Sequence, residues 1–266
     1  MDHFKALYAA DSNYINYPIF ACFPRLHNND YVDIERKVTQ EDIKDVVFAM
    51  GSWKAPDSDG LSVKFYQQFW DIIAESITTW VKYIFQNPAN IAKVNKTLIG
   101  VSADNILVVQ EVVHTMRDQN QGKGLMAIKI DLEKIYDRLN WDFVVDTLKD
   151  AGIPDNIINV IAFCISTPTM NLLWNGSPSE SFTLTRGIRQ EDPLSRYLFV
   201  LCVKRLSHLI NKLVKGKKWE PISISRNRPN LSHLYFADDL VLFARANSEQ
   251  VHMIKKTLHT FCDSSR

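Results

Sequence analysis

The chain contains 266 residues, of which 46% are hydrophobic and 23% are charged. This length and composition predict a folded globular chain that buries a substantial core, and they exclude an intrinsically disordered one. The formal net charge of +1 excludes the broad positive field that marks many nucleic-acid-binding proteins. Any nucleic-acid function must therefore rest on a local groove.

Cysteine usage and hydropathy indicate the compartment. The cysteines stand far apart, without a Cys-x-x-Cys pair or zinc-ligand spacing, which favours a reduced intracellular protein. They are Cys22, Cys164, Cys202 and Cys262. Residues 1–20 lack the apolar stretch of a signal peptide, and no run approaches the roughly 18 apolar residues of a membrane span. We expect a chain that is neither secreted nor embedded in a membrane.

Two helices are predicted in the first third of the chain. Thr39 and Asp42 form a capping-box pattern that starts the first helix. Its apolar residues are spaced to share one face, and they are Ile43, Val46, Val47 and Met50. A turn-rich segment, residues 51–60, separates it from a longer helix that continues to Pro88. The apolar positions of the second helix are Phe65, Phe69, Ile72, Ile73, Ile77, Trp80 and Ile84.

A helix, a strand and a second helix follow in the middle of the chain. Asp104 is placed to cap a helix that ends near Arg117. The apolar run 125–130 predicts a buried strand that leads directly into Asp131. The next helix is expected to begin near Trp141 and to end at Gly152.

The last third combines hairpins with one long helix. Residues 171–174 and 181–184 predict two strands of a hairpin, and Pro193 is suited to the first turn of a helix that ends near Val214. Two apolar strands, 234–236 and 240–243, then flank an acidic turn. Helices and hairpins alternate in this way, so the predicted fold class is α+β.

The acidic turn is the most informative local feature. Adjacent side chains on a regular strand point to opposite faces, so Asp238 and Asp239 can reach one spot only at a bend. Asp131 ends another apolar strand, and three carboxylates could hold two divalent ions about 3.5–4 Å apart, an arrangement suited to in-line phosphoryl transfer. An ordinary hairpin turn and a solvated strand end are the alternative interpretations.

Several long segments resemble consecutive motifs of a known family. MAIKIDLEKIYDRLNWDF (126–143), LLWNGSPSESFTLTRGIRQEDPLSRYLFVLCVKRLS (172–207) and LSHLYFADDLVLFA (231–244) resemble, in order, the palm motifs of reverse transcriptases from non-LTR (LINE-type) retrotransposons. The resemblance is closest to plant elements, and residues 38–73 are similar to the fingers region of the family. It implies a right-hand, palm-and-fingers α+β fold and RNA-directed DNA polymerase activity.

The resemblance also implies residue roles. Asp131, Asp238 and Asp239 match the catalytic, metal-binding triad, with a backbone carbonyl from Leu132, and the cofactor would be two Mg²⁺ ions, with Mn²⁺ as a substitute. Tyr136 matches the aromatic gate against a ribose 2′-OH, although a core aromatic is the alternative interpretation. The nucleotide-binding motif TRGIRQ contributes Gly187 and Gln190. Further candidate nucleic-acid contacts are Arg186, Arg189, Lys215, Lys217 and Lys218, although for the lysines a solvated helix end is the favoured interpretation.

The implied partners are an RNA template, a DNA primer and deoxynucleoside triphosphates. Full-length relatives act at chromosomal DNA, so the resemblance implies a nuclear location. Nothing in the sequence predicts the oligomeric state. Residues 1–103 are interpreted as an N-terminal extension with part of the fingers, 104–250 as the palm, and 251–266 as the start of a truncated thumb or connector.

Some positions depart from the family pattern. Glu191 stands where the family has glycine, and its larger, negatively charged side chain is expected to crowd or repel nucleic acid. Arg196 replaces a proline, and Asp57 with Ser58 replaces Gly-Pro in the fingers loop. Between Ile99 and Gly100 several dozen family residues are missing, including the arginine that grips the triphosphate. These departures predict impaired nucleotide binding.

Two alternatives to an active polymerase remain. One is a non-catalytic, nucleic-acid-binding remnant of a retroelement, which would bind template without turnover. The other is a different palm-type metal enzyme, such as a nucleotide cyclase, because strand-borne aspartates are shared by fold rather than by reaction. The TRGIRQ and NLLWNG segments argue against a cyclase.

Overall fold

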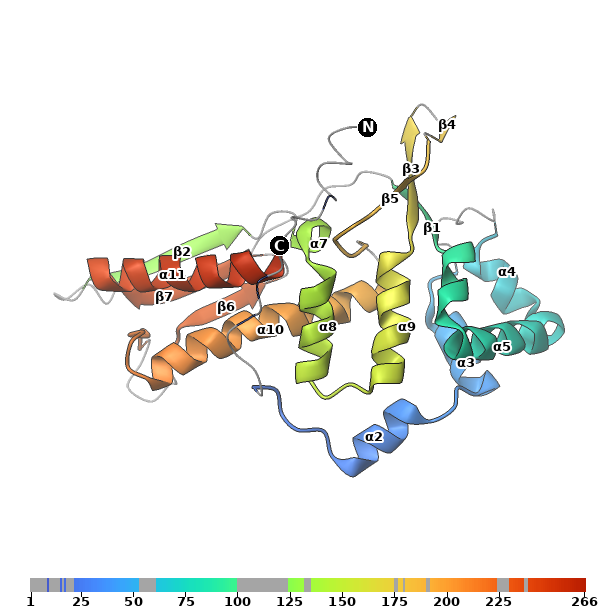
Figure 1. Cartoon of the computed structure of the whole chain (residues 1–266), viewed down its shortest axis with the longest axis horizontal. Coiled ribbons are helices and arrows are strands. Elements are labelled where there is room, and N and C mark those ends of the chain that lie inside the picture. The colour runs from blue at the N-terminus through green and yellow to red at the C-terminus, as the bar shows by residue number, and fades with distance from the viewer. Residues whose placement is uncertain are drawn as a thin grey trace. The chain divides into compact units, whose positions relative to one another are not determined.

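The computed structural model describes residues 22–52, 61–99, 124–131, 135–174, 177–178, 180–189, 192–223, 230–236 and 239–266, with Ala9, Ile15 and Tyr17 (Figure 1). The chain divides into two compact units. Unit 1 comprises Met1–Ala9, Pro24–Val101 and Ala151–Thr185, and unit 2 comprises Ala10–Phe23, Ser102–Asp150 and Arg186–Arg266. The assignment of segments to fingers, palm and thumb stays a prediction.

Unit 1 is built mainly from helices. Its described helices are α2 (Asn28–Glu35), α3 (Gln40–Ala49), α4 (Val63–Gln68), α5 (Trp70–Gln86), the 3₁₀ helix η1 (Pro88–Lys93) and α9 (Asp155–Ser166). The single long helix predicted up to Pro88 is wrong in one respect, because it is interrupted at Phe69 (φ −103°, ψ 19°). Phe69 ends α4 and serves as the N-cap of α5.

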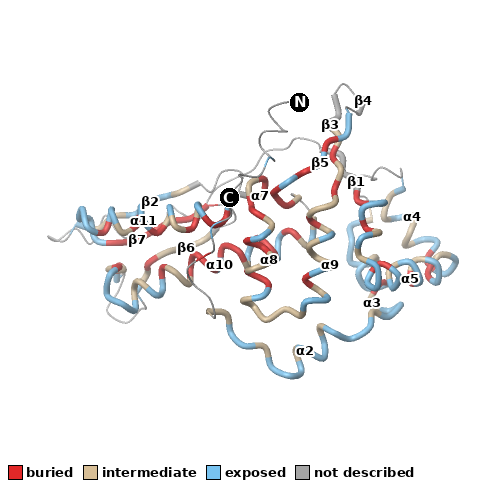
Figure 2. The backbone as a smooth tube through the Cα atoms, viewed as in Figure 1, coloured by how far each residue is buried: buried red, intermediate tan, exposed pale blue. Residues whose placement is uncertain are grey.

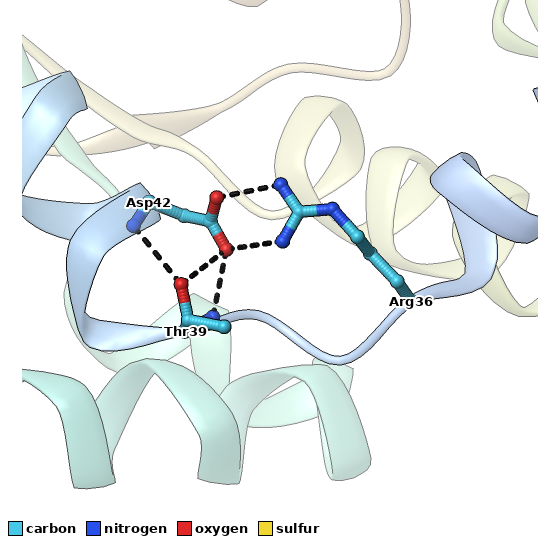
Figure 3. Close-up of polar contacts among 3 residues, drawn as sticks. All are labelled: Arg36, Thr39 and Asp42. Carbon is cyan, nitrogen blue, oxygen red and sulfur yellow. Dashed lines mark hydrogen bonds and ion pairs between the residues drawn. The ribbon is translucent and has the colours of Figure 1, made fainter.

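The predicted capping box at the start of α3 is confirmed (Figure 3). The Asp42 backbone N–H donates to Thr39 Oγ1 at 3.2 Å, and Asp42 Oδ2 accepts from the Thr39 backbone N–H at 2.8 Å. Arg36 donates two hydrogen bonds of 2.6 Å to the same carboxylate. The Arg36 hydrogen bond, followed by those from Thr39, holds the pKa of Asp42 well below its usual range. The Asp42 carboxylate therefore caps the helix start and is also paired with the positive charge of Arg36.

The apolar faces of α3 and α5 agree only in part with the predicted ones. Ile43, Trp70 and Ala74 form the buried cluster, and the partly buried residues against it are Val38, Val47, Ile77 and Val81. Several residues assigned to the buried face are instead exposed: Val46, Met50, Phe69, Ile72 and Trp80. Helical spacing alone allowed either of two overlapping stripes, and contact between α3 and α5 selects the one centred on Trp70 and Ala74.

A small sheet completes unit 1. Strand β3 (Thr169–Trp174) pairs in parallel with β1 (Lys96–Ile99) and antiparallel with both β4 (Ser177–Pro178) and β5 (Phe182–Thr183). The hairpin predicted from residues 171–174 and 181–184 is confirmed, with Met170 opposite Phe182.

Unit 2 combines an antiparallel sheet with helices. It contains β2 (Leu125–Asp131), α7 (Ile135–Arg138), α8 (Trp141–Asp150), α10 (Pro193–Lys215), β6 (His233–Phe236), β7 (Asp239–Arg245) and α11 (Ser248–Ser265). The predicted strand before Asp131, the helices from Trp141 and Pro193, and the acidic hairpin are all confirmed. The helix predicted over 104–117 lies outside the described residues.

The sheet of unit 2 has the order β2-β7-β6, and both pairings are antiparallel. The mixture of helices and hairpins confirms the α+β class. Figure 2 shows buried residues gathered in β7, α8 and α10, whereas α2 of unit 1 has none. Helix α10 packs against α8 and α11. Among the described residues, no helix is long and apolar enough to cross a membrane.

A buried arginine lies in the core of unit 2. Arg205 of α10 is 1% exposed, and its guanidinium lies 4.7 Å from the Tyr17 ring centroid and 5.2 Å from that of Phe143. Arg205 Nη1 also donates to Thr147 Oγ1 at 3.2 Å. The contacts with two aromatic rings and one hydroxyl group offset the desolvation cost of burying this charge.

Tyr17 joins the N-terminal segment to this core. Its ring is fully buried and meets the rings of Phe143 and Phe261 edge to face, at centroid distances of 5.5 and 6.3 Å. Its hydroxyl donates to the backbone carbonyl of Arg205 at 3.0 Å. Burial raises the pKa of this phenol far above its ordinary value. Tyr17 is therefore an anchor of unit 2.

Removing this anchor should destabilise unit 2 selectively. We expect Tyr17→Ala to lower the free energy of unfolding by about 3–5 kcal/mol, as for other large core aromatics. Tyr17→Phe should lower it by about 1 kcal/mol, because only the hydroxyl bond is lost. Hydrogen exchange is measured by mass spectrometry across a urea series for wild type and Tyr17→Ala. The substitution should speed exchange more in α8, α10 and α11 than in α3 and α5. Equal protection in wild type and Tyr17→Ala would contradict the assignment.

Candidate metal and nucleotide site

The pairing of β2 with β7 brings two predicted catalytic positions together. The antiparallel ladder runs over seven pairs, from Leu125 opposite Arg245 to Asp131 opposite Asp239. Positions directly opposite one another in such a ladder lie on the same face of the sheet, with Cβ atoms about 4.5–5.5 Å apart. The ladder therefore ends with two carboxylate residues side by side.

Burial of β7 fixes this register. Its first six residues, from Asp239 to Ala244, are all buried, and Leu240, Leu242 and Ala244 are at most 1% exposed. A one-residue slip would exchange the two faces of the strand and move Asp239 away from Asp131. On the other face Val241 and Phe243 pack with Ile222. The apolar residues thus hold the acidic pair in place.

Asp239 is a buried carboxylate with a cation beside it. Only 9% of its side chain is exposed, and Oδ2 lies 2.9 Å from Lys129 Nζ. Lys129 belongs to β2, two residues before Asp131, and its side chain is 40% exposed. The ammonium group shows that this carboxylate environment accommodates a positive charge, as a divalent metal site must.

The structure describes the other predicted metal ligands less completely than Asp239. Asp238 and Leu132 lie outside the described residues, and for Asp131 the structure describes the backbone position. Within the described part of the chain, no group of three or more acidic, histidine or cysteine side chains forms a metal-binding cluster. The hairpin itself is closed by the pair Phe236 and Asp239.

The neighbouring strand β6 adds little positive charge at neutral pH. Burial, followed by the charge of Lys204, lowers the pKa of His233 to about 4. Burial raises the pKa of Tyr235 to about 12. Both groups are therefore neutral near pH 7, and because they pair with Leu242 and Leu240 they lie on the opposite face of the sheet from Asp239.

The segment around Gly187 docks against the residues that follow β2. The Ile188 N–H donates to the Tyr136 carbonyl at 2.7 Å, and the Gly187 N–H donates to the Leu139 carbonyl at 2.8 Å. The Gly187 carbonyl accepts from Trp141 Nε1 at 2.7 Å. Gly187 has φ +86°, and an added Cβ would lie 2.6 Å from the Asp137 carbonyl oxygen. The position therefore requires glycine for conformation and for space.

The structure places the other candidate residues as follows. Tyr136 stacks on Phe199, with ring centroids 4.4 Å apart and planes at 16°. Arg186 is buried, and Arg189 forms an ion pair of 2.9 Å with Asp192, the residue that caps α10. Gln190 and Glu191 lie outside the described residues.

The lysine run lies at the end of α10. Lys215 is the last residue of the helix, and Lys217 has a positive φ of 56°. The Lys218 carbonyl accepts from Gln250 Nε2 at 2.9 Å, so the turn after α10 is bonded to α11. This supports a structured helix end with exposed ammonium groups, as the solvated-end interpretation expects.

Sequence reasoning did not single out Lys129 or Trp141. A signal for Lys129 was present, because strand alternation places it on the same face as Asp131. Nothing in the sequence indicated that Trp141 would donate to the Gly187 carbonyl. A cavity of about 760 Å³ in unit 1, between α2, α3, α5 and α9, contains none of the predicted site residues.

Residues 78–266 match the sequence family described as reverse transcriptase (RNA-dependent DNA polymerase). The chain belongs to the reverse transcriptase family. The match contains every candidate site residue, from Asp131 to Lys218 and the acidic hairpin. The predicted relationship and the α+β reverse transcriptase fold are thereby confirmed.

Relatives of this reverse transcriptase domain come mainly from retroelements. The chain is 29% identical over 156 residues to the Pol polyprotein of the type-2 retrotransposable element R2DM from Drosophila melanogaster, a match that covers 59% of this chain and 14% of the polyprotein. It is 46% identical over 65 residues to an uncharacterised mitochondrial protein of Arabidopsis thaliana, covering 24% of this chain and 53% of that protein. The matches thus span about half of one relative and a small part of the other. They support a non-LTR type of reverse transcriptase.

A similar solved structure is the apo telomerase of Candida tropicalis. It has a TM-score of 0.41 and 18% sequence identity, and the match covers 75% of this chain and 40% of the telomerase chain.

The docking of the Gly187 segment can be tested by adding one methyl group. We expect Gly187→Ala to destabilise unit 2 by roughly 2 kcal/mol or more, because alanine disfavours φ +86° and its Cβ meets a backbone carbonyl. Gly216→Ala is the matched control, since φ there is −76°. Urea unfolding should show a large loss for Gly187→Ala and a change within about 1 kcal/mol for the control. Equal stability of both variants would contradict the steric argument.

Proposed function

We propose that this reverse transcriptase domain is an RNA-directed DNA polymerase that uses two divalent metal ions. The observation that carries the proposal is the register of β2 and β7, which pairs Asp131 with a buried Asp239 at the end of a rigid ladder. Family membership supports the reaction type. Carboxylate oxygens are the ligands that Mg²⁺ prefers, so the residues present suit the metal.

Asp131, Asp238 and Asp239 would hold the ions, with the backbone carbonyl of Leu132 as a further ligand. When bound, the ions would lower the pKa of a primer hydroxyl and stabilise the charge on the transferred phosphoryl group. The protein would contribute position: the ladder holds the carboxylates together, and the seven-pair sheet resists their separation. Template RNA, a DNA primer and deoxynucleotides are the proposed partners, and a nuclear location is proposed on family grounds alone.

The segment at Gly187 would form the floor beside the nucleotide. Backbone hydrogen bonds join Gly187 and Ile188 to Leu139 and Tyr136. Because position 187 has no side chain, its backbone can approach Asp137 closely. Gln190 would follow it toward the template. Tyr136, stacked on Phe199, would be held rigid by that contact and would disfavour a ribose 2′-OH.

Glu191 would lower the polymerase activity relative to a domain that has glycine at this position. A carboxylate at a position that otherwise approaches nucleic acid would repel phosphate groups. This favours one second candidate, a domain that binds template weakly or without turnover. The experiment below therefore includes the variant that restores glycine.

The decisive assay is Mg²⁺-dependent incorporation of deoxynucleotides on a primed homopolymer RNA. We expect Asp239→Asn to reduce incorporation at least about 100-fold, because a metal-binding charge is lost while the side-chain volume is kept. Asp263→Asn, a change of the same type at an exposed position on α11, should leave incorporation unchanged. Glu191→Gly should increase it.

Two outcomes would count against the proposal. Incorporation that survives Asp239→Asn would contradict the metal-site assignment. Absence of incorporation in both folded wild type and Glu191→Gly, combined with RNA binding that weakens as salt rises, would favour the non-catalytic candidate.

A further inference from the structure

Lys129 lies on the same face of the sheet as Asp131 and Asp239. Lys129 and Asp131 are two residues apart on β2, and Asp131 lies opposite Asp239 on β7, so positions 129, 131 and 239 share one face. Lys129 lies opposite Val241, one of the buried residues of β7. Its ammonium group thus reaches diagonally along the sheet to Asp239 Oδ2, at 2.9 Å.

We propose that Lys129 is a positioning residue that serves as a replaceable counter-ion of Asp239 and gives way when a divalent metal binds. The inference rests on the proposed function and adds to it a residue with a defined task. In the metal-free chain, Lys129 would hold the carboxylate at the ladder end. In the metal-bound chain, the divalent ion would take its place.

The burial of the two partners explains why a counter-ion is needed. The Asp239 side chain is 9% exposed, and a nearly buried carboxylate without a positive partner is strongly destabilised. Lys129 is 40% exposed, so its head group can leave the carboxylate and enter water without disturbing the core. The pair is therefore asymmetric, with a fixed anion and a movable cation.

Charge forces the exchange between lysine and metal. The Lys129 ammonium lies 2.9 Å from Oδ2, and a divalent ion bound to the same carboxylate would be repelled by a positive group at this distance. Metal binding must therefore break the ion pair. Breaking it weakens the observed metal affinity, while the lysine keeps the empty site folded.

The test compares lysine variants in the full chain. Lys129→Met removes the charge and keeps the apolar stem, whereas Lys129→Arg keeps the charge. Lys256→Met, at an exposed lysine on α11, is the matched control. Mn²⁺ affinity is measured from the free-ion electron paramagnetic resonance signal, and thermal midpoints are recorded with EDTA and with Mg²⁺.

The expected results are specific to the counter-ion role. Lys129→Met should bind Mn²⁺ roughly two- to fivefold more tightly, a range set by the usual strength of partly exposed ion pairs. Its midpoint should fall in EDTA and recover in Mg²⁺. Lys129→Arg and Lys256→Met should resemble wild type. A lysine that merely stabilised the fold would lower both midpoints and leave the affinity unchanged.

A second measurement uses the wild-type chain and needs no variant. Acetylation of Lys129, measured by mass spectrometry, should become faster when Mg²⁺ is added, because the ammonium is released from Asp239. Lys256 should react at the same rate with and without Mg²⁺. Lys129 labelling that is unchanged or slowed by Mg²⁺ would overturn the inference even if Lys129→Met failed to fold.

The results also separate this inference from the proposed function. If wild type binds Mn²⁺ and a folded Lys129→Met binds it equally or less tightly, the counter-ion role is wrong and the metal site stands. If neither folded protein binds Mn²⁺, the proposed metal site is wrong, and the inference falls with it.

Discussion

The antiparallel ladder between β2 and β7 is the constraint on which the rest of unit 2 depends. Its seven pairs fix the register, and the register decides that the ladder ends with Asp131 opposite Asp239. Apolar packing maintains it, because Leu240, Leu242 and Ala244 are almost completely buried. Hydrophobic packing several residues away thus places the two aspartates opposite each other.

Electrostatics then determines what the sheet can hold. A carboxylate as buried as Asp239 is stabilised by a positive partner, and Lys129 supplies one. His233 and Tyr235 of β6 pair with Leu242 and Leu240, so they lie on the opposite face of the sheet from Asp239 and take no part in its charge balance. Among the described residues, Lys129 pairs with Asp239 beside the position of Asp131, and this charge pattern suits exchange between an ammonium group and a metal ion.

Local signals predicted much of unit 2 and less of unit 1. The apolar run before Asp131, the acidic hairpin and Pro193 each carried a clear signal, and all were confirmed. The buried face of α5 was predicted only in part, because apolar residues occupy both sides of that helix and contact with α3 selects one. Ile77 and Ile84 lie inward as predicted, whereas Ile72 and Trp80 are exposed. Long-range contacts such as Tyr17 with Arg205, 188 residues apart, leave no pattern in the sequence. The roles of Asp238 and Gln190 stay predictions.

The position at which a metal ion binds can be mapped independently of turnover. Fe²⁺ replaces Mg²⁺ at carboxylate sites, and with ascorbate and peroxide it cleaves nearby backbone, so the cut positions map its location. A metal site at the end of the β2 and β7 ladder predicts cuts near residue 131 and within 236–239, suppressed by excess Mg²⁺ and lost in Asp239→Asn. Cuts confined to other segments, or cuts at these positions that Asp239→Asn leaves unchanged, would contradict the claim that the β2 and β7 ladder builds a metal site.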